Sequence, residues 1–180
     1  KELDELLDEV RRSSETSERI LRKLLREAEE STDRSKRTLK ELLRELEEVV
    51  ERVKKMIRDG KPKEKVLKEL EDAVRRVLED VRRSSEENKK SLEEIVRRVR
   101  RSSEENERTV RRVVEDARRR NGEKLKDLEK ALRDLLDRDR KLVEELEDRL
   151  RKLAEEDEKV LRELEEELKR LLEEVAEETR

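Results

Sequence analysis

An 18-residue repeat runs through this chain and restricts it to long helices. The hexapeptide Arg-Ser-Ser-Glu-Glu-Asn occurs at residues 83–88 and again at residues 101–106. Because 18 residues make about five turns of an α-helix, the second copy points in the same direction as the first, about 27 Å further along. A heptad repeat would impose a left-handed supercoil, whereas this period matches the relaxed helix. We therefore expect nearly straight helices.

The apolar residues follow the same period and lie on one face of each helical segment. In the first segment, Leu3, Leu21, Leu39 and Ile57 succeed one another at intervals of 18 residues. At about 100° per residue, these positions and their neighbours fall within an arc about 140° wide, the apolar face of an amphipathic helix. The chain has no aromatic, His or Cys residue, so its core must be aliphatic and without disulfides.

Charged residues make up 58% of the chain, a proportion that is usual in disordered proteins. Here 51 Lys and Arg residues alternate with 54 Asp and Glu residues around a regular apolar stripe, which is typical of long helices and coiled coils. Because the signs are interspersed, there is no basic face for nucleic acid or for an anionic membrane surface. No apolar run approaches the ~18 residues of a transmembrane helix, and we expect neither a membrane span nor a signal peptide.

Two short breaks divide the helical pattern into three segments. Gly60 suits the left-handed position that ends a helix, and Pro62 suits the first turn of the next helix. Asn121 and Gly122 form a second helix-ending signal. Links this short force neighbouring helices to be antiparallel, so the sequence predicts an all-α, antiparallel up-down-up three-helix bundle. We expect one domain over residues 1–180, with helices at about residues 2–58, 62–120 and 123–180.

Polar residues interrupt the apolar face at the repeat period. In the first two segments, Ser, Thr and Asn residues occupy positions that Leu, Ile or Val fill in other repeats. They are Ser13, Ser14, Ser17, Ser31, Thr32 and Ser35, followed by Ser84, Ser85, Asn88, Ser102, Ser103 and Asn106. In the third segment, the Leu stripe is continuous only if Asp139 and Asp157 are counted as members. The pattern therefore predicts that these polar residues face the interior of the bundle.

An up-down-up fold brings the polar residues together at two heights. Residues of the first and second helices lie level when their numbers sum to about 120, and those of the second and third when the sum is about 243. Asp139 and Asp157 then each lie level with one polar set on both other helices. We name the two predicted sets layer 1 and layer 2. Layer 1 contains Ser13, Ser14, Ser17, Ser102, Ser103, Asn106 and Asp139, and layer 2 contains Ser31, Thr32, Ser35, Ser84, Ser85, Asn88 and Asp157.

Each layer has the donors and acceptors of a hydrogen-bond network. A carboxylate offers about four acceptor sites, while Ser hydroxyls and Asn amides supply donors. A buried polar group without a partner costs free energy, so such a layer must be closed. Helices that slip by one turn would place Asp against Leu, and we interpret the layers as a device for specific helix packing. Any single Ser could instead be solvated, but spacing, face and height all agree on burial.

No pattern in the chain indicates catalysis. Asp139 and Asp157 lie about 27 Å apart along one helix, whereas paired glycosidase carboxylates need about 5–10 Å. Each layer has one carboxylate and no His or Cys, which is too few strong ligands for a metal ion. Ser13 and Ser102 lack the His or Lys base that a Ser nucleophile needs. We therefore expect no enzyme, no catalytic residue, no metal site and no cofactor.

Together these features resemble those of parametrically designed de novo helical bundles. The resemblance rests on the copied hexapeptide, helices of equal length, minimal Asp-Gly-Lys-Pro and Asn-Gly links, the absence of aromatic residues and a Glu, Lys and Arg surface. The polar layers are similar to the buried hydrogen-bond networks of such bundles. The resemblance implies a soluble synthetic scaffold with no natural compartment or activity, which would be cytoplasmic on recombinant expression. Natural spectrin-like bundles are less regular and usually contain aromatic residues.

Two other functions stay open at this stage. The apolar arcs are slightly wide for a three-helix core, so the chain could self-associate or accept a fourth helix from a partner. Against such an interaction module, there is no second apolar face and no exposed aromatic anchor. A small-molecule site at a polar layer is a weaker alternative, because the surrounding Leu and Val layers show no small-residue gap. We expect a monomer that requires no partner.

Overall fold

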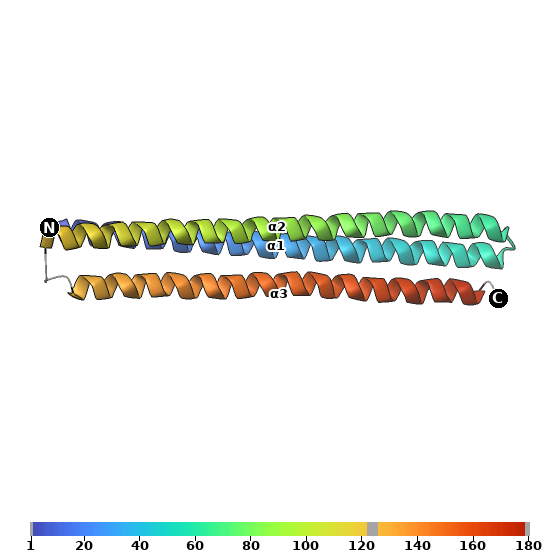
Figure 1. Ribbon diagram of the computed structural model, residues 1–180. Helices are drawn as coiled ribbons and strands as arrows, with labels where there is room; N and C mark the ends of the chain where they lie inside the picture. Colours follow the sequence, from blue (N-terminus) through green and yellow to red (C-terminus); the bar gives the residue numbers. More distant parts are fainter. Residues whose placement is uncertain (1, 122–125, 179–180) are drawn as a thin grey trace. The chain divides into compact units, whose positions relative to one another are not determined.

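The described residues form three α-helices in a computed structural model, drawn in Figure 1. They are α1 (Glu2–Arg58), α2 (Lys63–Asn121) and α3 (Lys126–Glu178). The structure describes the backbone of residues 2–121 and 126–178, with side chains within residues 4–119, at residue 126 and within residues 129–178. Within these ranges there is no strand, and the helices pack against one another. The prediction of an all-α three-helix bundle is confirmed.

The helix boundaries agree with the sequence pattern, with a small correction at the start of α2. The first helix has the predicted bounds, whereas the second begins at Lys63 instead of Pro62 and ends at Asn121. The carbonyl oxygen of Pro62 accepts hydrogen bonds from the backbone N–H groups of Lys65 at 3.1 Å and Val66 at 3.2 Å. Pro62 therefore precedes the helix as a capping residue. The predicted start of the third helix at residues 123–125 and its end at 179–180 lie outside the described residues.

The first turn uses Gly60 as predicted. Its φ of 77° lies in the left-handed region, where a residue without a Cβ has no steric penalty. The N–H of Gly60 donates to the carbonyl of Ile57 at 3.1 Å, and the N–H of Lys61 donates to the carbonyl of Met56 at 3.1 Å. This pair of hydrogen bonds is the Schellman motif, which satisfies the last carbonyls of α1 and reverses the chain.

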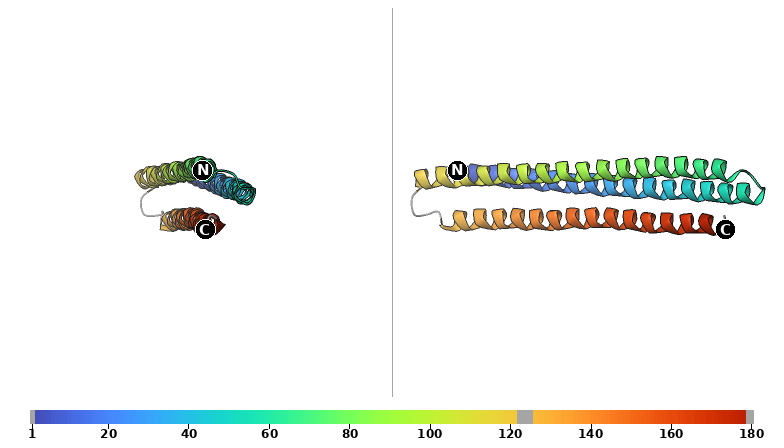
Figure 2. Two further views of the ribbon diagram at one scale, coloured as in Figure 1. Left: turned by 90° about the vertical axis from the view of Figure 1, so that its right-hand side faces the viewer. Right: turned by 45° about the vertical axis from the view of Figure 1, so that its right-hand side comes forward.

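The helices contribute to two compact units. Unit 1 consists of Lys1–Glu29 and Leu92–Lys152, and unit 2 consists of Glu30–Ser91 and Leu153–Arg180. Figure 2 lets the reader follow α1, α2 and α3 from two further directions. Each helix therefore supplies one segment to each unit. The single domain expected over residues 1–180 stays a prediction.

Long-range contacts define the direction of the helices within each unit. In unit 2, Ser31 of α1 bonds to Asn88 of α2, while Lys36 of α1 bonds to Glu156 of α3. In unit 1, Ser13 likewise bonds to Asn106 of α2. The numbers of the α1 and α2 partners have a nearly constant sum, so α2 is antiparallel to α1. The up-down order follows from the short first turn.

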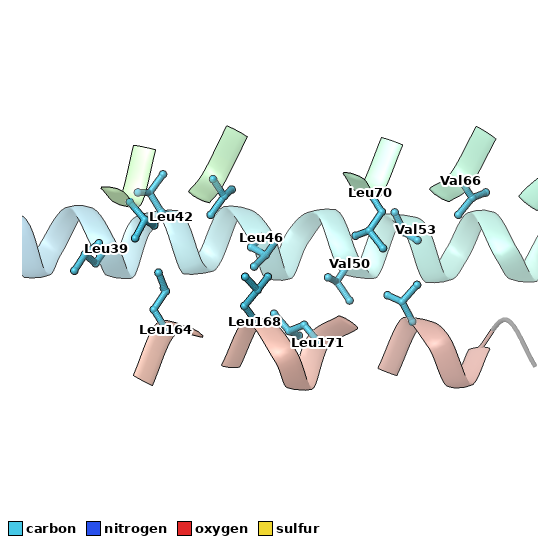
Figure 3. Close-up of a cluster of buried hydrophobic side chains, with 13 residues drawn as sticks. Leu39, Leu42, Leu46, Val50, Val53, Val66, Leu70, Leu164, Leu168 and Leu171 are labelled. Carbon is cyan, nitrogen blue, oxygen red and sulfur yellow. The ribbon is translucent and has the colours of Figure 1, made fainter. Parts of the chain in front are cut away.

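The core of unit 2 is built from aliphatic residues of all three helices (Figure 3). Its labelled members in Figure 3 are Leu39, Leu42, Leu46, Val50, Val53, Val66, Leu70, Leu164, Leu168 and Leu171. They recur at steps of three and four residues, so each helix turns one apolar stripe toward the other two. Burying a side chain of this kind stabilises the folded state by about 1.5–3 kcal/mol.

The core of unit 1 is likewise built from aliphatic residues of all three helices. Val10, Val110, Val113 and Leu132 form a buried cluster to which α1, α2 and α3 all contribute. The Leu and Val rows on either side of the polar residues therefore fix the separation of the helices. This separation places the polar side chains within hydrogen-bond reach.

Candidate functional site

The candidate site is the pair of polar layers, one in each unit. Eight polar residues of the described chain are buried, and every one belongs to layer 1 or layer 2. They are Ser17, Ser102, Asn106 and Asp139 in unit 1, and Thr32, Ser35, Asn88 and Asp157 in unit 2. Polar burial is therefore confined to the two heights that the repeat specifies.

The carboxyl group of Asp139 connects three helices in layer 1. Its Oδ1 accepts a hydrogen bond from the hydroxyl of Ser17 in α1 at 2.9 Å. Its Oδ2 accepts one from the hydroxyl of Ser103 in α2 at 3.2 Å. The side chain is only 7% exposed, and each oxygen has one hydroxyl donor from a different helix. The carboxyl therefore joins α3 to both neighbours.

The amide of Asn106 forms the second half of layer 1. Its Oδ1 accepts hydrogen bonds from Ser13 at 2.8 Å and from Ser14 at 3.4 Å. Its Nδ2 is buried and has no hydrogen-bond partner among the described residues. An unsatisfied buried donor costs about 1–3 kcal/mol. In layer 1 the amide oxygen of Asn106 is therefore bonded, whereas its amide donor is not.

Layer 2 repeats the carboxyl arrangement. Asp157 is 5% exposed, its Oδ1 accepts from the hydroxyl of Ser35 at 2.7 Å and its Oδ2 accepts from the hydroxyl of Ser85 at 3.3 Å. The donors come from α1 and α2, as they do at Asp139. The carboxyl half of the network is thus conserved in form between the two units.

The amide half of layer 2 is closed on both sides. Asn88 Oδ1 accepts from Ser31 at 2.7 Å and from Thr32 at 3.5 Å. Asn88 Nδ2 donates to Thr32 Oγ1 at 3.4 Å. Thr32 Oγ1 is within reach of both ends of the amide, whereas the equivalent Ser14 bonds only to the oxygen. This single difference decides whether the amide donor has a partner.

Two predicted members do not join the networks. Ser102 is buried and Ser84 is half-buried, yet neither makes a hydrogen bond within the described part of the chain. They precede Ser103 and Ser85 by one residue, and it is the hydroxyls of Ser103 and Ser85 that bond to the carboxyl groups. Sequence spacing placed all four at the correct height but did not determine which hydroxyl of each adjacent pair bonds.

Ion pairs beside the layers were not anticipated from the sequence. Lys36 Nζ lies 2.7 Å from Glu156 Oε2, next to Ser35 and Asp157 of layer 2. Lys54 Nζ lies 2.7 Å from Glu174 Oε2 one repeat later. These charged residues lie at equal heights on α1 and α3, as the members of each layer do. The equal-height relation, applied to charged residues of the sequence, would therefore have predicted both pairs.

The charge of α1 reverses between the two units. In unit 1, α1 supplies the acid to bases on α2 and α3, in the pairs Glu9–Arg112, Glu27–Arg98 and Glu29–Arg149. In unit 2, α1 supplies the base to acids on α2 and α3, in the pairs Arg52–Glu69, Lys36–Glu156, Lys54–Glu174 and Arg58–Glu178. These interhelical pairs therefore differ in sign between the two units.

The Lys54–Glu174 pair perturbs the titration of both members. The hydrogen bond to Glu174 raises the pKa of Lys54 above its ordinary value of 10.5. The hydrogen bond from Lys54 lowers the pKa of Glu174 below its ordinary value of 4.5. The Lys54 side chain is 14% exposed, which makes this pair better shielded from water than Lys36–Glu156.

The described residues offer limited means for other chemistry. Among them, no group of three or more His, Cys, Asp or Glu side chains is placed to hold a metal ion. None of the helices, as far as they are described, is apolar enough over a sufficient length to cross a bilayer. Asp139 and Asp157 lie in separate units. The groups in each layer can donate and accept hydrogen bonds and can hold the helices in position, and each layer has one carboxyl group.

Comparisons with known proteins returned no relative. No protein-family model matches this chain, and neither a curated protein nor a solved structure matches it.

Proposed function

We propose that this chain is a designed structural scaffold whose polar layers specify how its helices pack. The observation that carries the proposal is the network of layer 2 inside an aliphatic core. Asp157 of α3 accepts hydrogen bonds from α1 and α2, and Asn88 of α2 accepts from Ser31 and donates to Thr32 of α1. Its near-copy 18 residues away, together with the lack of any matching family, supports a designed origin. The proposal includes no catalytic activity and no required partner.

The physical basis of the specificity is an asymmetry in the cost of mispairing. A satisfied buried hydrogen bond adds only about 0.5–1.5 kcal/mol, whereas an orphaned buried group costs about 1–3 kcal/mol. A one-turn slip of α3 would separate Asp157 from Ser35 and Ser85 together. Alternative registers are therefore penalised more than the native register is stabilised.

The ion pairs of α1 support the same role at longer range. A slip of α3 by one full repeat would carry Asp139 to the height of layer 2, so the layers alone distinguish this register weakly. The same slip would carry Arg138 to the height of Lys36, where Glu156 stands in the native register. Like charges disfavour such a register, in addition to the loss of the second carboxyl.

The test of the proposal removes both carboxyl groups from the layers. In the Asp139→Leu, Asp157→Leu double variant, the hydroxyls of Ser17, Ser35 and their α2 counterparts lose their acceptors. We expect doubled or broadened amide signals in a ¹⁵N correlation spectrum, because several registers become similar in energy. A Leu146→Met, Leu164→Met variant is the matched control and should keep one set of signals. A higher melting temperature with one sharp set of signals in the Leu variant would refute the specificity role.

A second candidate is a module that binds another helix, and a groove in unit 1 favours it. The groove lies between α2 and α3, has a volume of about 270 Å³ and includes Val110, Val114, Leu132 and Leu136 in its lining. Light scattering after gel filtration separates the two functions. A mass of 21.8 kDa at all concentrations supports the scaffold, and a concentration-dependent increase supports the module.

A further inference from the structure

A cleft lies beside layer 1, between α1 and α3 of unit 1. Its volume is about 570 Å³. Leu135 and Leu142 line it together with charged residues of both helices, and two members of layer 1, Ser14 and Asp139, also belong to its wall. The polar layer in this unit is therefore reachable from outside.

The Asp139 carboxyl retains capacity for a further hydrogen bond. It accepts one bond from Ser17 and one from Ser103, while a carboxylate has about four acceptor sites. No basic side chain pairs with it within the described residues. A donor that enters the cleft would therefore find a usable oxygen.

The unpartnered Nδ2 of Asn106 supplies the complementary group. Asn106 is 2% exposed and contacts Ser14, the same residue that lines the cleft. A molecule lodged between Ser14 and the amide would be offered a buried N–H donor. Layer 1 thus contains an unpartnered donor on Asn106 and an acceptor with spare capacity on Asp139, and Ser14, which bonds to Asn106, lines the same cleft as Asp139.

Layer 2 shows what the closed form of this site looks like. Thr32 is the equivalent of Ser14 in the repeat, and its Oγ1 accepts a hydrogen bond from the amide N–H of Asn88. An ion pair of Lys36 with Glu156 bridges α1 and α3 beside it. In unit 1 the equivalent residues are Glu18 and Arg138, but Glu18 pairs with Arg22 at 2.5 Å within α1. No ion pair joins Glu18 to Arg138 in the described chain.

We propose that layer 1 binds a small hydroxyl-bearing molecule, of which water is the smallest. Its oxygen would accept from Asn106 Nδ2 and its hydroxyl would donate to the Asp139 carboxyl. A buried water is expected only where a site is roomy and offers several polar partners. The cleft has the volume, and Ser14 and Asp139 of layer 1 lie in its wall. This inference holds whether or not the scaffold function is correct, because it concerns the contents of one layer.

The first experiment detects water at the two Asn amides of the intact ¹⁵N-labelled chain. Rotating-frame Overhauser spectra should show a water cross-peak at the side-chain NH₂ of Asn106 and none at Asn88. Asn88 is an internal control, because it also neighbours Ser and Thr hydroxyls that can relay exchange with water. A reciprocal pair of variants sharpens the test. Ser14→Thr should abolish the peak at Asn106, and Thr32→Ser should create one at Asn88.

The second experiment distinguishes water from a small alcohol by titrating ethylene glycol into the same sample. A saturable shift at Asn106 with loss of its water peak, and none at Asn88, identifies an organic hydroxyl ligand. Retention of the water peak throughout identifies water. Absence of both signals at Asn106, or contacts of its NH₂ protons with a protein acceptor alone, would overturn the proposal. Circular dichroism of both variants verifies that the helices are intact.

Discussion

Units 1 and 2 contain nearly the same polar residues at the same spacing, yet only one of their layers is closed. Thr32 is fully buried and forms hydrogen bonds with both the oxygen and the nitrogen of the Asn88 amide. Ser14 is half-buried at a cleft and forms a hydrogen bond only with the amide oxygen of Asn106. The comparison teaches that nearly the same polar residues can form either a satisfied network or one with a buried, unpartnered donor. Equal spacing in the sequence does not ensure equal satisfaction of donors.

The units differ in a second way, in the sign of their interhelical charges. The α1 segment is acidic toward its neighbours in unit 1, as at Glu29, and basic in unit 2, as at Lys36. Exposed ion pairs contribute little to stability, about 0–1 kcal/mol each. Their arrangement nevertheless distinguishes two otherwise similar repeats. The layers are therefore alike in the two repeats, whereas the interhelical ion pairs differ between them.

The largest expected effect on the free energy of unfolding comes from truncating one core side chain in each unit. Leu46→Ala in unit 2 and Leu132→Ala in unit 1 should each cost about 2–5 kcal/mol, because both side chains are 1% exposed and leave a cavity. Hydrogen exchange resolved by residue then compares the units. Faster exchange in both units after either change indicates one cooperative domain. Acceleration restricted to the altered unit would contradict the single domain predicted from the sequence.

The next effect concerns the Thr and Ser that distinguish the layers. Thr32→Ser should lower the free energy of unfolding by about 1 kcal/mol, because it removes a fully buried methyl group. Ser14→Thr should change stability by less, because the added methyl group enters the space of the cleft. Urea unfolding measures both. A greater loss for Ser14→Thr than for Thr32→Ser would show that layer 1 is more tightly packed than the cleft indicates.

A smaller effect is expected from pH, through Lys54 and Glu174 of unit 2. The raised pKa of Lys54 gives stability that is complete below 10.5 and is lost as the pH rises through the folded-state value. The lowered pKa of Glu174 gives stability that is complete above 4.5 and is lost as the pH falls through the folded-state value.

The measurement compares the wild type with Lys54→Gln by urea unfolding across the pH range. The difference between them should be largest from 4.5 to 10.5 and should shrink at both ends. Lys23→Gln, at an exposed position of unit 1, is the control for the loss of one lysine charge. A difference independent of pH would mean that Lys54 acts through packing of its aliphatic stem.

The smallest effect is expected for the charge pair beside layer 2. Lys36→Glu should place two acids together and cost up to about 1 kcal/mol, and adding Glu156→Lys should restore most of the loss. A double-mutant cycle in low and high salt measures the coupling. Failure of the second change to rescue the first would exclude the pair as a determinant of register.

Much of the fold was predictable because it follows from local rules. The helical period, the left-handed Gly60 and the short links determine the helices and their order. The height rule also paired Ser17 with Asp139 and Ser35 with Asp157, since rise per residue and loop length are nearly constant. The exclusion of Ser84 and Ser102 from the hydrogen bonds was not predictable. It depends on which of two adjacent hydroxyls comes within hydrogen-bond distance of the carboxyl group, and the pattern does not determine that distance.

By itself, the sequence determined which residues share a face and a height, because both quantities are properties of one helix. Only the tertiary structure decided which donors meet acceptors. The donor–acceptor distance of a hydrogen bond can vary by only a few tenths of an ångström. Whether a given pair meets this limit depends on how far the neighbouring Leu and Val residues hold the helices apart. Hence Thr32 and Ser14 are equivalent in the repeat but differ in the folded chain. The unpartnered donor of Asn106 and the cleft between α1 and α3 both depend on how the helices pack together, so neither is a property of a single helix.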